Sequence, residues 1–462
     1  MTSFTMPQEI YGERSTITGR QFRFGFDDMS KLTEPTTHLS PVPVAEGGLF
    51  GDFFTTGRCS GFHKTALMDG RGRRVFEMAR RACDAGVYPF QLPLEGRSGP
   101  WVQAEGRRYL MLSSYDYLGL IGDERVNRAA VEAISQYGTG TGGVRMLTGT
   151  IDIHHEMERE LAAFKGTQEV VGFSSGYLAN LAVLSALLSP LDRVVMDALA
   201  HRSLVDACRL AGVPVRRFAH NDCDSLRKEL ATDPPAGRTL IVADGVFSMD
   251  GDICPLPDLV AVKKEFGCYL LIDEAHSFGV LGAGGRGTDE HFGVAPTDVD
   301  IWTGSLAKAI PSNGGFLALS QELAIYLQHA AAPFIFSAAL CPSAVAAIRE
   351  SINILRNEPE RVACLREGSN YLRNGLRDLG YNVGMSQTAV IPVIFGDEAV
   401  TTLFAGRLRD MGVLAIPVIF PAVAQGVARL RLCVTAAHSK ADLDFALDAF
   451  RKLKDWVPVV PK

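Results

Sequence analysis

The sequence has little that suits a partner of nucleic acid or of a membrane. Its 46 lysines and arginines stand against 52 aspartates and glutamates, which gives a net charge of −6. No basic surplus is therefore available to neutralise phosphates. Every apolar run is shorter than the roughly 18 residues of a transmembrane helix. The N-terminal thirty residues contain acids and lack the apolar segment of a secretory signal.

The nine cysteines lack any pattern as well. They are scattered without a CxxC pair, which is typical of reduced cytoplasmic thiols and not of a disulfide framework or a zinc site. With 47% hydrophobic and 21% charged residues, the composition is that of a globular protein with a large core. At about 100–200 residues per domain, 462 residues predict two or three domains. We expect a cytoplasmic globular protein.

Helical patterns alternate with short apolar runs over residues 125–345. The clearest runs lie at 194–197, 239–245 and 269–275. Each of them carries an acidic residue at the expected carboxyl end of a strand. Such alternation predicts an α/β fold with a mostly parallel, doubly covered sheet, and ligands bind at the carboxyl ends of the strands in sheets of this kind.

The rest of the chain frames this α/β domain. Residues 1–70 have no sustained period and indicate a surface arm. Residues 73–85 have the apolar spacing of a helix with a basic face, which suits a packed helix or a helix on a membrane surface. Residues 101–114 alternate like a hairpin that turns at Glu105–Gly106. The predicted parts are an N-terminal arm and segment, a large α/β domain and a small α+β domain, at 1–124, 125–345 and 346–462.

The glycine cluster at 138–143, Gly-Thr-Gly-Thr-Gly-Gly, formally matches the dinucleotide-binding pattern GxGxxG. That fingerprint requires a strand before it and a helix after it, whereas a helical pattern precedes this cluster. The dinucleotide interpretation therefore fails. A tight turn near a ligand or a purely structural turn accounts for the glycines.

Two segments have the residue types of a ligand site. Ser175, Gly176 and Tyr177 open directly onto a helical pattern, so their N–H groups suit a phosphate, although many loops contain Ser-Ser-Gly. Asp273 and His276 follow a buried run, where a lone aspartate is as often a helix cap as a catalytic group. No third histidine or carboxylate lies at metal-ligand spacing, so we expect no metal here.

Lys308 lies in a run of small residues without a neighbouring acid. Such a lysine is often merely exposed, but apolar, glycine-rich surroundings also suit the lowered pKa that a Schiff-base amine needs. A phosphate-binding helix start, an acid after a strand and a lysine 35 residues later follow the order of fold type I pyridoxal-phosphate (PLP) enzymes. In these enzymes an aspartate keeps the pyridine ring protonated while the ring takes up carbanion charge.

With these motifs, the chain resembles the α-oxoamine synthase family over about residues 85–455. The matching stretches are SSYDYLGL (113–120), YGTGTGGVRMLTGT (137–150), FSSGYLANLA (173–182), DALAHRSLVDAC (197–208), DGVFSMDGDICPL (244–256), LIDEAHSFGVLG (271–282), SLAKAIPSNGGF (305–316), PFIFSAALCPS (333–343) and RLRLCVTAAH (429–438). The resemblance implies a fold type I PLP-dependent transferase that condenses an amino acid with an acyl thioester and releases CO₂ and the thiol.

The resemblance also implies a PLP site. Lys308 corresponds to the Schiff-base lysine, Asp273 to the partner of the pyridine nitrogen, and His201 to the imidazole that stacks on the ring. The alternative for His201 is a polar residue at a helix start. His276 and Ser248 correspond to groups near the phenolic oxygen of the coenzyme. The catalytic set is Lys308, His201, Asp273 and His276, and the phosphate site comprises Ser175, Gly176, Tyr177, Ser305 and Ser337.

The substrates and partners follow from the same resemblance. Arg431 matches the arginine that holds the substrate carboxylate, a bidentate task that arginine performs better than lysine. Tyr115 joins it as a substrate-binding residue. Ser337 lies in the segment that reaches the phosphate from the other subunit, which implies a homodimer with shared active sites. The thioester is an acyl-CoA or an acyl carrier protein, and no nucleic acid is expected.

Within the family, the chain is most similar to serine palmitoyltransferase, but the segment before Arg431 lacks the proline-threonine-rich loop of that enzyme. Serine, alanine and glycine therefore stay open as the amino acid. An 8-amino-7-oxononanoate synthase or a specialised-metabolite synthase is the alternative. Another fold type I aminotransferase would share only the lysine and the aspartate, and a non-catalytic partner subunit would have lost the lysine.

Overall fold

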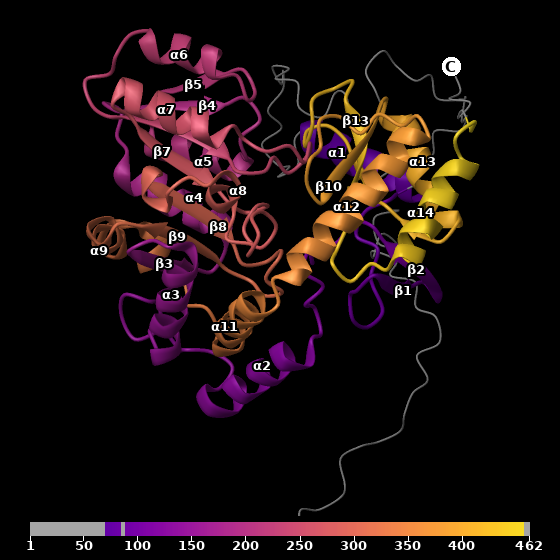
Figure 1. The fold of residues 1–462 in the computed structure, drawn as a ribbon, viewed down its shortest axis with the longest axis horizontal. Coiled ribbons are helices and arrows are strands. Elements are labelled where there is room, and N and C mark those ends of the chain that lie inside the picture. Colours follow the sequence, from indigo (N-terminus) through magenta and orange to yellow (C-terminus); the bar gives the residue numbers. More distant parts are fainter. Residues whose placement is uncertain (1–69, 85–87, 457–462) are drawn as a thin grey trace, which may run out of the picture. The chain divides into compact units, whose positions relative to one another are not determined.

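The computed structural model describes residues 70–84 and 88–456, whose helices and strands Figure 1 shows in chain order. The helix predicted over 73–85 is present as α1 (Gly70–Asp84). Apart from Gly70, the predicted surface arm at 1–70 lies outside the described residues. Among the described residues, no helix is both long and apolar enough to cross a membrane.

A seven-stranded sheet forms the core of the α/β part, in the order β3-β9-β8-β7-β6-β4-β5. Its strands are β3 (Glu169–Phe173), β4 (Arg193–Asp197), β5 (Val215–Phe218), β6 (Thr239–Asp244), β7 (Tyr269–Asp273), β8 (Ile301–Ser305) and β9 (Gly315–Leu319). From β8 to β5 all neighbours are parallel, and β9 runs antiparallel to β3 and β8. The predicted mostly parallel sheet is confirmed, and the three predicted apolar runs are β4, β6 and β7.

Helices cover both faces of this sheet, because its central strands alternate two apolar faces. Val194 and Met196 pack with the helices α4 (Gly176–Leu187), α5 (Arg202–Ala211) and α9 (Gln321–Ala330). Val195 packs on the opposite face with α3 (Asp152–Lys165), α6 (Cys223–Ala231), α7 (Leu256–Phe266) and α11 (Pro342–Asn357). The remaining helices here are α2 (Glu124–Tyr137), α8 (Thr288–Phe292), α10 (Ala332–Ile335) and the 3₁₀ helix η3 (Pro296–Asp298).

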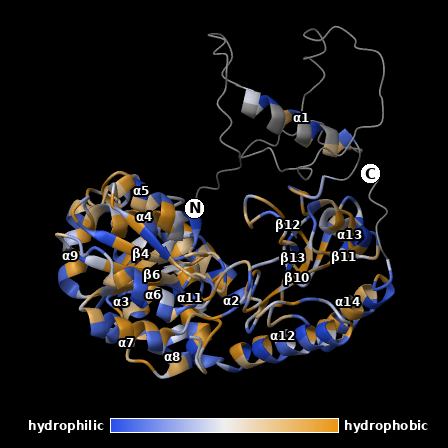
Figure 2. Ribbon diagram, turned by 90° about the horizontal axis from the view of Figure 1, so that it is seen from above, coloured by the Kyte–Doolittle hydropathy of each residue, from blue (hydrophilic) through white to orange (hydrophobic). Residues whose placement is uncertain are grey.

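The C-terminal part contains two three-stranded sheets. One has the order β10-β13-β12 and the other β1-β2-β11. The strands are β1 (Trp101–Ala104), β2 (Arg107–Met111), β10 (Val390–Gly396), β11 (Val413–Leu414), β12 (Pro417–Val418) and β13 (Ala428–Cys433). The helices are α12 (Glu360–Asp378), α13 (Glu398–Asp410) and α14 (Lys440–Lys452). Figure 2 shows α12 with hydrophilic and hydrophobic residues on different sides, as its buried residues at Val362, Leu365, Leu372 and Leu376 require.

The predicted hairpin is β1–β2. Its turn residues Glu105 and Gly106 have φ of 50° and 69°, the left-handed pair that closes a tight hairpin. β2 also pairs in parallel with β11, so the hairpin belongs to a sheet that the C-terminal part completes. The domain boundaries predicted after residues 124 and 345 stay a prediction.

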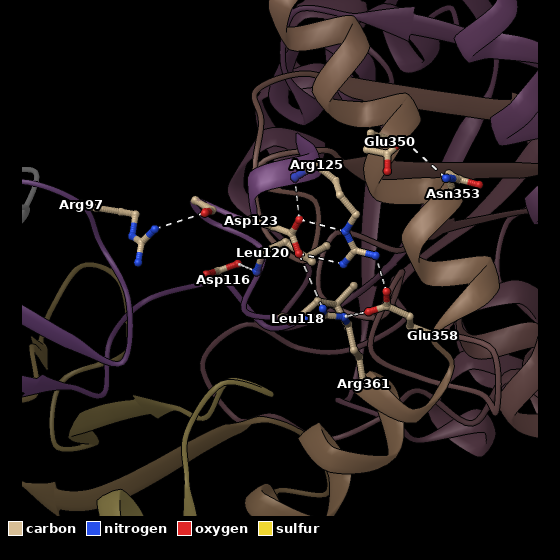
Figure 3. A network of polar contacts seen from close by, with 11 residues as sticks. Arg97, Asp116, Leu118, Leu120, Asp123, Arg125, Glu350, Asn353, Glu358 and Arg361 are labelled. Atoms are coloured by element: carbon tan, nitrogen blue, oxygen red, sulfur yellow. Dashed lines mark hydrogen bonds and ion pairs between the residues drawn. The ribbon is translucent and has the colours of Figure 1, made fainter. Parts of the chain in front are cut away.

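A network of charged side chains fixes the joint between α2, α11 and α12 (Figure 3). Asp123 caps α2 by accepting a hydrogen bond from the Arg125 amide (3.0 Å) and pairs with the Arg125 guanidinium (2.8 Å). Glu358, just after α11, binds Arg125 and also Arg361 (2.6 Å). The Arg361 guanidinium donates to the Leu118 carbonyl (3.4 Å). The network therefore also holds the 115–120 loop.

Asp123→Ala should lower the free energy of unfolding by about 1–2 kcal/mol at neutral pH, because a helix cap and an ion pair are lost together. The hydrogen bond from Arg125 lowers the pKa of Asp123 from 3.8 to about 2. A depressed folded-state pKa stabilises the fold above pH 3.8, and this contribution disappears as the pH falls towards 2. Urea unfolding should show that the difference in the free energy of unfolding between wild type and variant becomes smaller as the pH falls over this range.

Glu350→Ala is the matched control. Glu350 lies on neighbouring α11, and its hydrogen bond from Asn353 is long (3.4 Å) and exposed. Its removal should change the free energy of unfolding by less than about 0.5 kcal/mol. Equal losses for the two variants would contradict a special role of the Asp123 network.

Candidate active site

A cavity of about 230 Å³ opens at the carboxyl ends of the parallel strands. Eight of the predicted site residues line it: Ser175, Gly176, Tyr177, His201, Asp273, His276, Ser305 and Lys308. Asn180, Ser203 and Asp244 line it as well. Four predicted residues are absent from this lining, namely Tyr115, Ser248, Ser337 and Arg431. The topology thus brings together groups that lie more than a hundred residues apart in the chain.

One end of the cavity is the start of helix α4. Ser175 is the N-cap, and its hydroxyl accepts a hydrogen bond from the Leu178 amide (3.2 Å). A Cβ on Gly176 would lie 3.1 Å from the Gly304 carbonyl oxygen and 3.2 Å from the Ser305 Cβ. A Cβ here would be in tighter contact with β8 than is usual, so glycine favours this close approach of the helix start. The first N–H groups of a helix have no partner within the helix and, with the helix dipole, form a cradle for an anion.

Asp273 ends β7 and is 4% exposed. Its Oδ2 accepts a hydrogen bond from the Asn180 amide (2.7 Å) and its Oδ1 accepts one from the Ala275 N–H (2.9 Å). The Asn180 amide also donates to the Ser203 hydroxyl (2.8 Å), which lies 2.7 Å from His201 Nδ1. This chain of hydrogen bonds fixes the carboxylate and the imidazole relative to each other.

His201 is both a helix cap and a cavity residue. It is the N-cap of α5, and its Nδ1 accepts a hydrogen bond from the Ser203 amide (3.3 Å). Burial lowers the pKa of His201, Lys308 lowers it further, and Asp273 acts in the opposite direction. The imidazole is therefore neutral with its hydrogen on Nε2. The two interpretations of this histidine from sequence are compatible.

His276 is held by Tyr117. The Tyr117 hydroxyl lies 2.8 Å from His276 Nδ1, and both side chains are buried. Burial keeps the pKa of His276 well below its ordinary value, and Lys308 and His201 lower it further. Burial also raises the pKa of Tyr117, which stays protonated. Since both groups are neutral, either the tyrosine hydroxyl or the Nδ1–H donates this hydrogen bond, according to the tautomer of the imidazole.

Lys308 lies beside two buried carboxyl groups. Burial lowers the pKa of its amine, while Asp273 and Asp244 act in the opposite direction. Asp244 ends β6 in register with Asp273 and accepts a hydrogen bond from the His201 amide (3.1 Å). Burial, with Asp273 nearby, raises the pKa of Asp244 well above its ordinary value. The proximity of Asp273 thus opposes ionisation of Asp244.

Arg431 and Tyr115 form a second group of polar side chains. The guanidinium lies 4.6 Å from the centre of the Tyr115 ring and donates to its hydroxyl. It also donates to the Ser248 carbonyl (3.4 Å). Tyr115 in turn meets the His276 ring edge to face at 5.8 Å. Within 88–456, Arg431 has no carboxylate at ion-pair distance, whereas nearby Arg429 pairs with Asp250.

The remaining predicted residue, Ser337, contacts its own chain. Its hydroxyl lies 3.3 Å from the Ser174 hydroxyl, one residue before the start of the α4 cradle. Phe336 beside it is 81% exposed. Ser248 contributes its backbone carbonyl to Arg431 and not its side chain to the cavity.

Sequence reasoning missed Asn180, Ser203, Asp244 and Tyr117. Asn180 is, with Ser185, one of the few polar residues in the mostly apolar helix α4, four positions after Gly176, and this position was a usable signal. Asp244 ends one of the three apolar runs, so its place at the sheet edge was expected but its role was not. Ser203 and Tyr117 had no signal of their own, because their partners lie on other segments.

Comparison with known proteins fits this geometry. Residues 107–450 match the family model for aminotransferase class I and II. The chain therefore belongs to the class I and II aminotransferase family, and within it to the α-oxoamine synthases. The predicted family and the fold type I architecture are confirmed.

Individual relatives refine the picture. 8-Amino-7-oxononanoate synthases of Exiguobacterium sibiricum and Symbiobacterium thermophilum are 42% and 43% identical to the chain, over 80% of this chain and 94% of each relative. A solved variant of serine palmitoyltransferase from S. paucimobilis, with a bound PLP–myriocin aldimine, has a TM-score of 0.80 and 33% identity, over 83% of this chain and 98% of that one. The sequence relatives thus favour 8-amino-7-oxononanoate synthase over serine palmitoyltransferase, the member that the motifs placed first.

Tyr117→Phe should raise the pKa of His276. We expect this result if the tyrosine hydroxyl donates to an unprotonated Nδ1, because its loss then removes an advantage of the neutral imidazole. ¹⁵N NMR of histidine-labelled protein reports the titration and the tautomer directly. Tyr115→Phe is the control, because it keeps the ring contact with His276 and removes no hydrogen bond to it. An unchanged His276 titration in Tyr117→Phe would show that the hydroxyl does not set the tautomer.

Proposed function

We propose that the protein condenses a small amino acid with an acyl thioester, with loss of CO₂ and of the thiol, and so forms an α-oxoamine. One observation carries this proposal. A lysine whose amine pKa is lowered, a buried aspartate and a helix N-terminus face one cavity. Beside it lies Arg431, an arginine without a carboxylate partner in the described part of the chain.

The residues present fit PLP, the cofactor of this family. The α4 cradle, where a Cβ on Gly176 would not fit easily, suits the phosphate. Asp273, held by Asn180, suits a protonated pyridine nitrogen, because a buried carboxylate stabilises the positive charge. His201 would stack on the coenzyme ring, and His276, whose Nδ1 is occupied by Tyr117, would use its Nε2 at the phenolic oxygen. When bound, PLP supplies an electron sink for negative charge at the amino acid Cα.

Arg431 is proposed to hold the substrate carboxylate. Its guanidinium is oriented by the Ser248 carbonyl and the Tyr115 ring, and it keeps donors free for a bidentate contact. Both partners are neutral, so they orient the cation without cancelling its charge. A fixed carboxylate leaves the Cα of the amino acid in one orientation during proton removal and acylation.

Lys308 is proposed to remove and return the Cα proton. A lowered pKa increases the unprotonated fraction of the amine, which is the form that a base requires. Burial and the nearby Asp273 oppose ionisation of Asp244. This weakens the attraction of Asp244 for a protonated Lys308 amine.

A homodimer is part of this proposal. Phe336 and Leu147 are 81% and 76% exposed, although both are large apolar residues. They lie on neighbouring segments, since the Ala339 amide, three residues after Phe336, donates to the Gly143 carbonyl (3.1 Å), four residues before Leu147. A second copy of the chain would bury them and bring its own 336–337 segment towards a phosphate site.

The predicted cytoplasmic location is proposed as well.

Alanine is the proposed amino acid, and the observation that favours it is the 42–43% identity to 8-amino-7-oxononanoate synthases. In the product that their name gives, the amino group is on the carbon next to the terminal methyl and the oxo group is one carbon further in. Loss of the amino acid carboxylate as CO₂ leaves a methyl side chain, which is that of alanine. The acyl group then carries a carboxylate at its far end.

Serine with a simple fatty acyl thioester is the second candidate. It is supported by the 33% identity and the TM-score of 0.80 to serine palmitoyltransferase. The two candidates differ by one hydroxyl on the amino acid and by one carboxylate on the acyl chain. An apolar pocket discriminates against an added hydroxyl by only about a hundredfold, so both amino acids need to be compared on one preparation.

Titration of the PLP-loaded protein with alanine, serine and glycine tests the proposal. Alanine should perturb the visible absorption of bound PLP at a concentration at least about tenfold lower than serine or glycine. Addition of a carboxyl-terminated acyl thioester should then release CO₂ and thiol in equal amounts. Lys308→Ala should abolish turnover. A wild-type protein that binds no PLP, or that transfers the amino group to a keto acid without releasing thiol, would refute the proposed reaction.

Arg431→Lys should raise the KM for the amino acid on the order of tenfold to a hundredfold, with a smaller change in kcat. Lysine keeps the charge but loses the bidentate fork, so ground-state binding suffers most. Arg429→Lys is the comparison, because Arg429 lies on the same strand as Arg431 but is already paired with Asp250. Equal KM effects from both variants would assign the carboxylate contact to neither residue.

A further inference from the structure

His220 lies just beyond β5 and does not line the cavity. Its ring nevertheless connects the turn that leads to His201 with the loop that contacts Arg431. Its Nδ1 is 3.0 Å from Asp197 Oδ1, and its Nε2 is 2.7 Å from Asp252 Oδ2. The ring edge packs on the face of Phe247 at 4.4 Å. Each ring nitrogen thus faces a carboxylate from a different loop.

This geometry requires an imidazolium. A carboxylate only accepts hydrogen bonds, so both ring nitrogens must carry hydrogen. Burial lowers the pKa of His220, but the hydrogen bonds to Asp197 and Asp252 outweigh it and raise the pKa to about 10. The bridge is therefore a cation between two anions at neutral pH, and its geometry is fixed at both ends.

The first end sets the turn that leads to His201. Asp197 closes β4, and its carboxylate also accepts hydrogen bonds from the Leu199 amide (2.8 Å) and the Asn221 amide (2.9 Å). Residues 198–200 are thus wound around the Asp197 side chain. The next residue is His201, whose imidazole lines the cavity. A shift of Asp197 would move the backbone from which that imidazole projects.

The second end closes the loop that holds Arg431. Asp252 receives the Asn221 side-chain amide (2.9 Å) besides His220, and its carbonyl accepts from the Phe247 amide (3.1 Å). The loop enclosed by this last bond presents the Ser248 carbonyl to Arg431 (3.4 Å). If Asp252 became mobile, the loop would no longer hold the Ser248 carbonyl in place for the Arg431 guanidinium.

We propose that His220 is a positioning residue that sets the His201 turn and the Arg431 loop together through its two carboxylate partners. Its catalytic consequence rests on the proposed function, in which His201 contacts the coenzyme and Arg431 the amino acid. The positional part does not depend on that function. Without the cation, the Asp197 and Asp252 carboxylates would face each other in a largely buried space and repel.

His220→Gln is the test variant, because glutamine has no positive charge and cannot donate along both ring directions. His329→Gln is the matched control: His329 is an exposed residue of α9, and its Nδ1 lies 2.7 Å from the Ile325 carbonyl of its own helix. Double substitution of His220 and Asp252 by glutamine and asparagine removes the cation together with one anion. This double variant should recover part of the hydrogen-exchange protection that His220→Gln loses, because the repulsion between the two carboxylates is relieved.

Hydrogen exchange of the full-length protein without PLP reads the positional part. In His220→Gln, peptides covering 197–201 and 245–252 should exchange on the order of ten times faster than in wild type, while peptides from β7 stay unchanged. With PLP and alanine, the KM for alanine should rise on the order of tenfold to a hundredfold, and the visible circular dichroism of bound PLP should change.

The outcomes separate the two proposals. Uniformly faster exchange with an unchanged KM and circular dichroism below the melting temperature would make His220 a general stability residue and overturn the inference. Unchanged exchange in both segments would overturn it as well. If exchange in His220→Gln is faster only in these segments, the bridge is supported. If the wild-type protein at the same time binds no PLP, the proposed function is refuted while the bridge stands.

Discussion

Three aspartates end three adjacent parallel strands, and the rest of the site depends on how their charges are compensated. Asp197, Asp244 and Asp273 close β4, β6 and β7, which are hydrogen-bonded neighbours in the sheet. All three are at most 4% exposed. Carboxylates in so poorly solvated a place are costly unless each is paired, hydrogen-bonded or protonated. Parallel topology brings them to one edge, and the loops that follow must stabilise them.

Each aspartate is compensated in a different way. Asp197 pairs with the His220 imidazolium and backbone amides. Asp244 accepts a hydrogen bond from the His201 amide, and burial with Asp273 nearby raises its pKa well above the ordinary value. Asp273 keeps an amide donor from Asn180 and is the carboxylate suited to a cationic partner that is not part of the chain. Asp273 is therefore the aspartate of this edge that we propose for a cationic ligand group, while Asp197 is already paired with His220.

The sequence predicted the parts of this arrangement that follow from local pattern. The apolar runs at β4, β6 and β7, the hairpin turn at Glu105–Gly106 and the helix start at Gly176 are all encoded over a few residues. Lys308 and Asp273 were identified by their order in the chain, and the cavity brings them together. Features that a few neighbouring residues determine are thus predictable from the sequence.

Contacts between distant loops were not accessible in the same way. His220 lies in no recognisable motif, and its two partners are 23 and 32 residues away. Tyr117 meets His276 across 159 residues. Such pairs depend on how loops at one sheet edge are packed, and neither periodicity nor spacing encodes that packing. The ranking of serine palmitoyltransferase above 8-amino-7-oxononanoate synthase has a similar origin, since the motifs that the two enzymes share describe the coenzyme site and not the acyl chain.

The parallel pairing of β2 with β11 has a consequence for biosynthesis. Leu110 and Met111 find their partners Val413 and Leu414 about 300 residues later in the chain. All strands of the seven-stranded sheet lie between these segments in the chain, so that sheet leaves the ribosome complete before the small one can close. During this interval the open edge of the hairpin is a free template for other strands. Arg107 and Arg108, exposed at the start of β2, place charge on that waiting edge, where it opposes association between nascent chains.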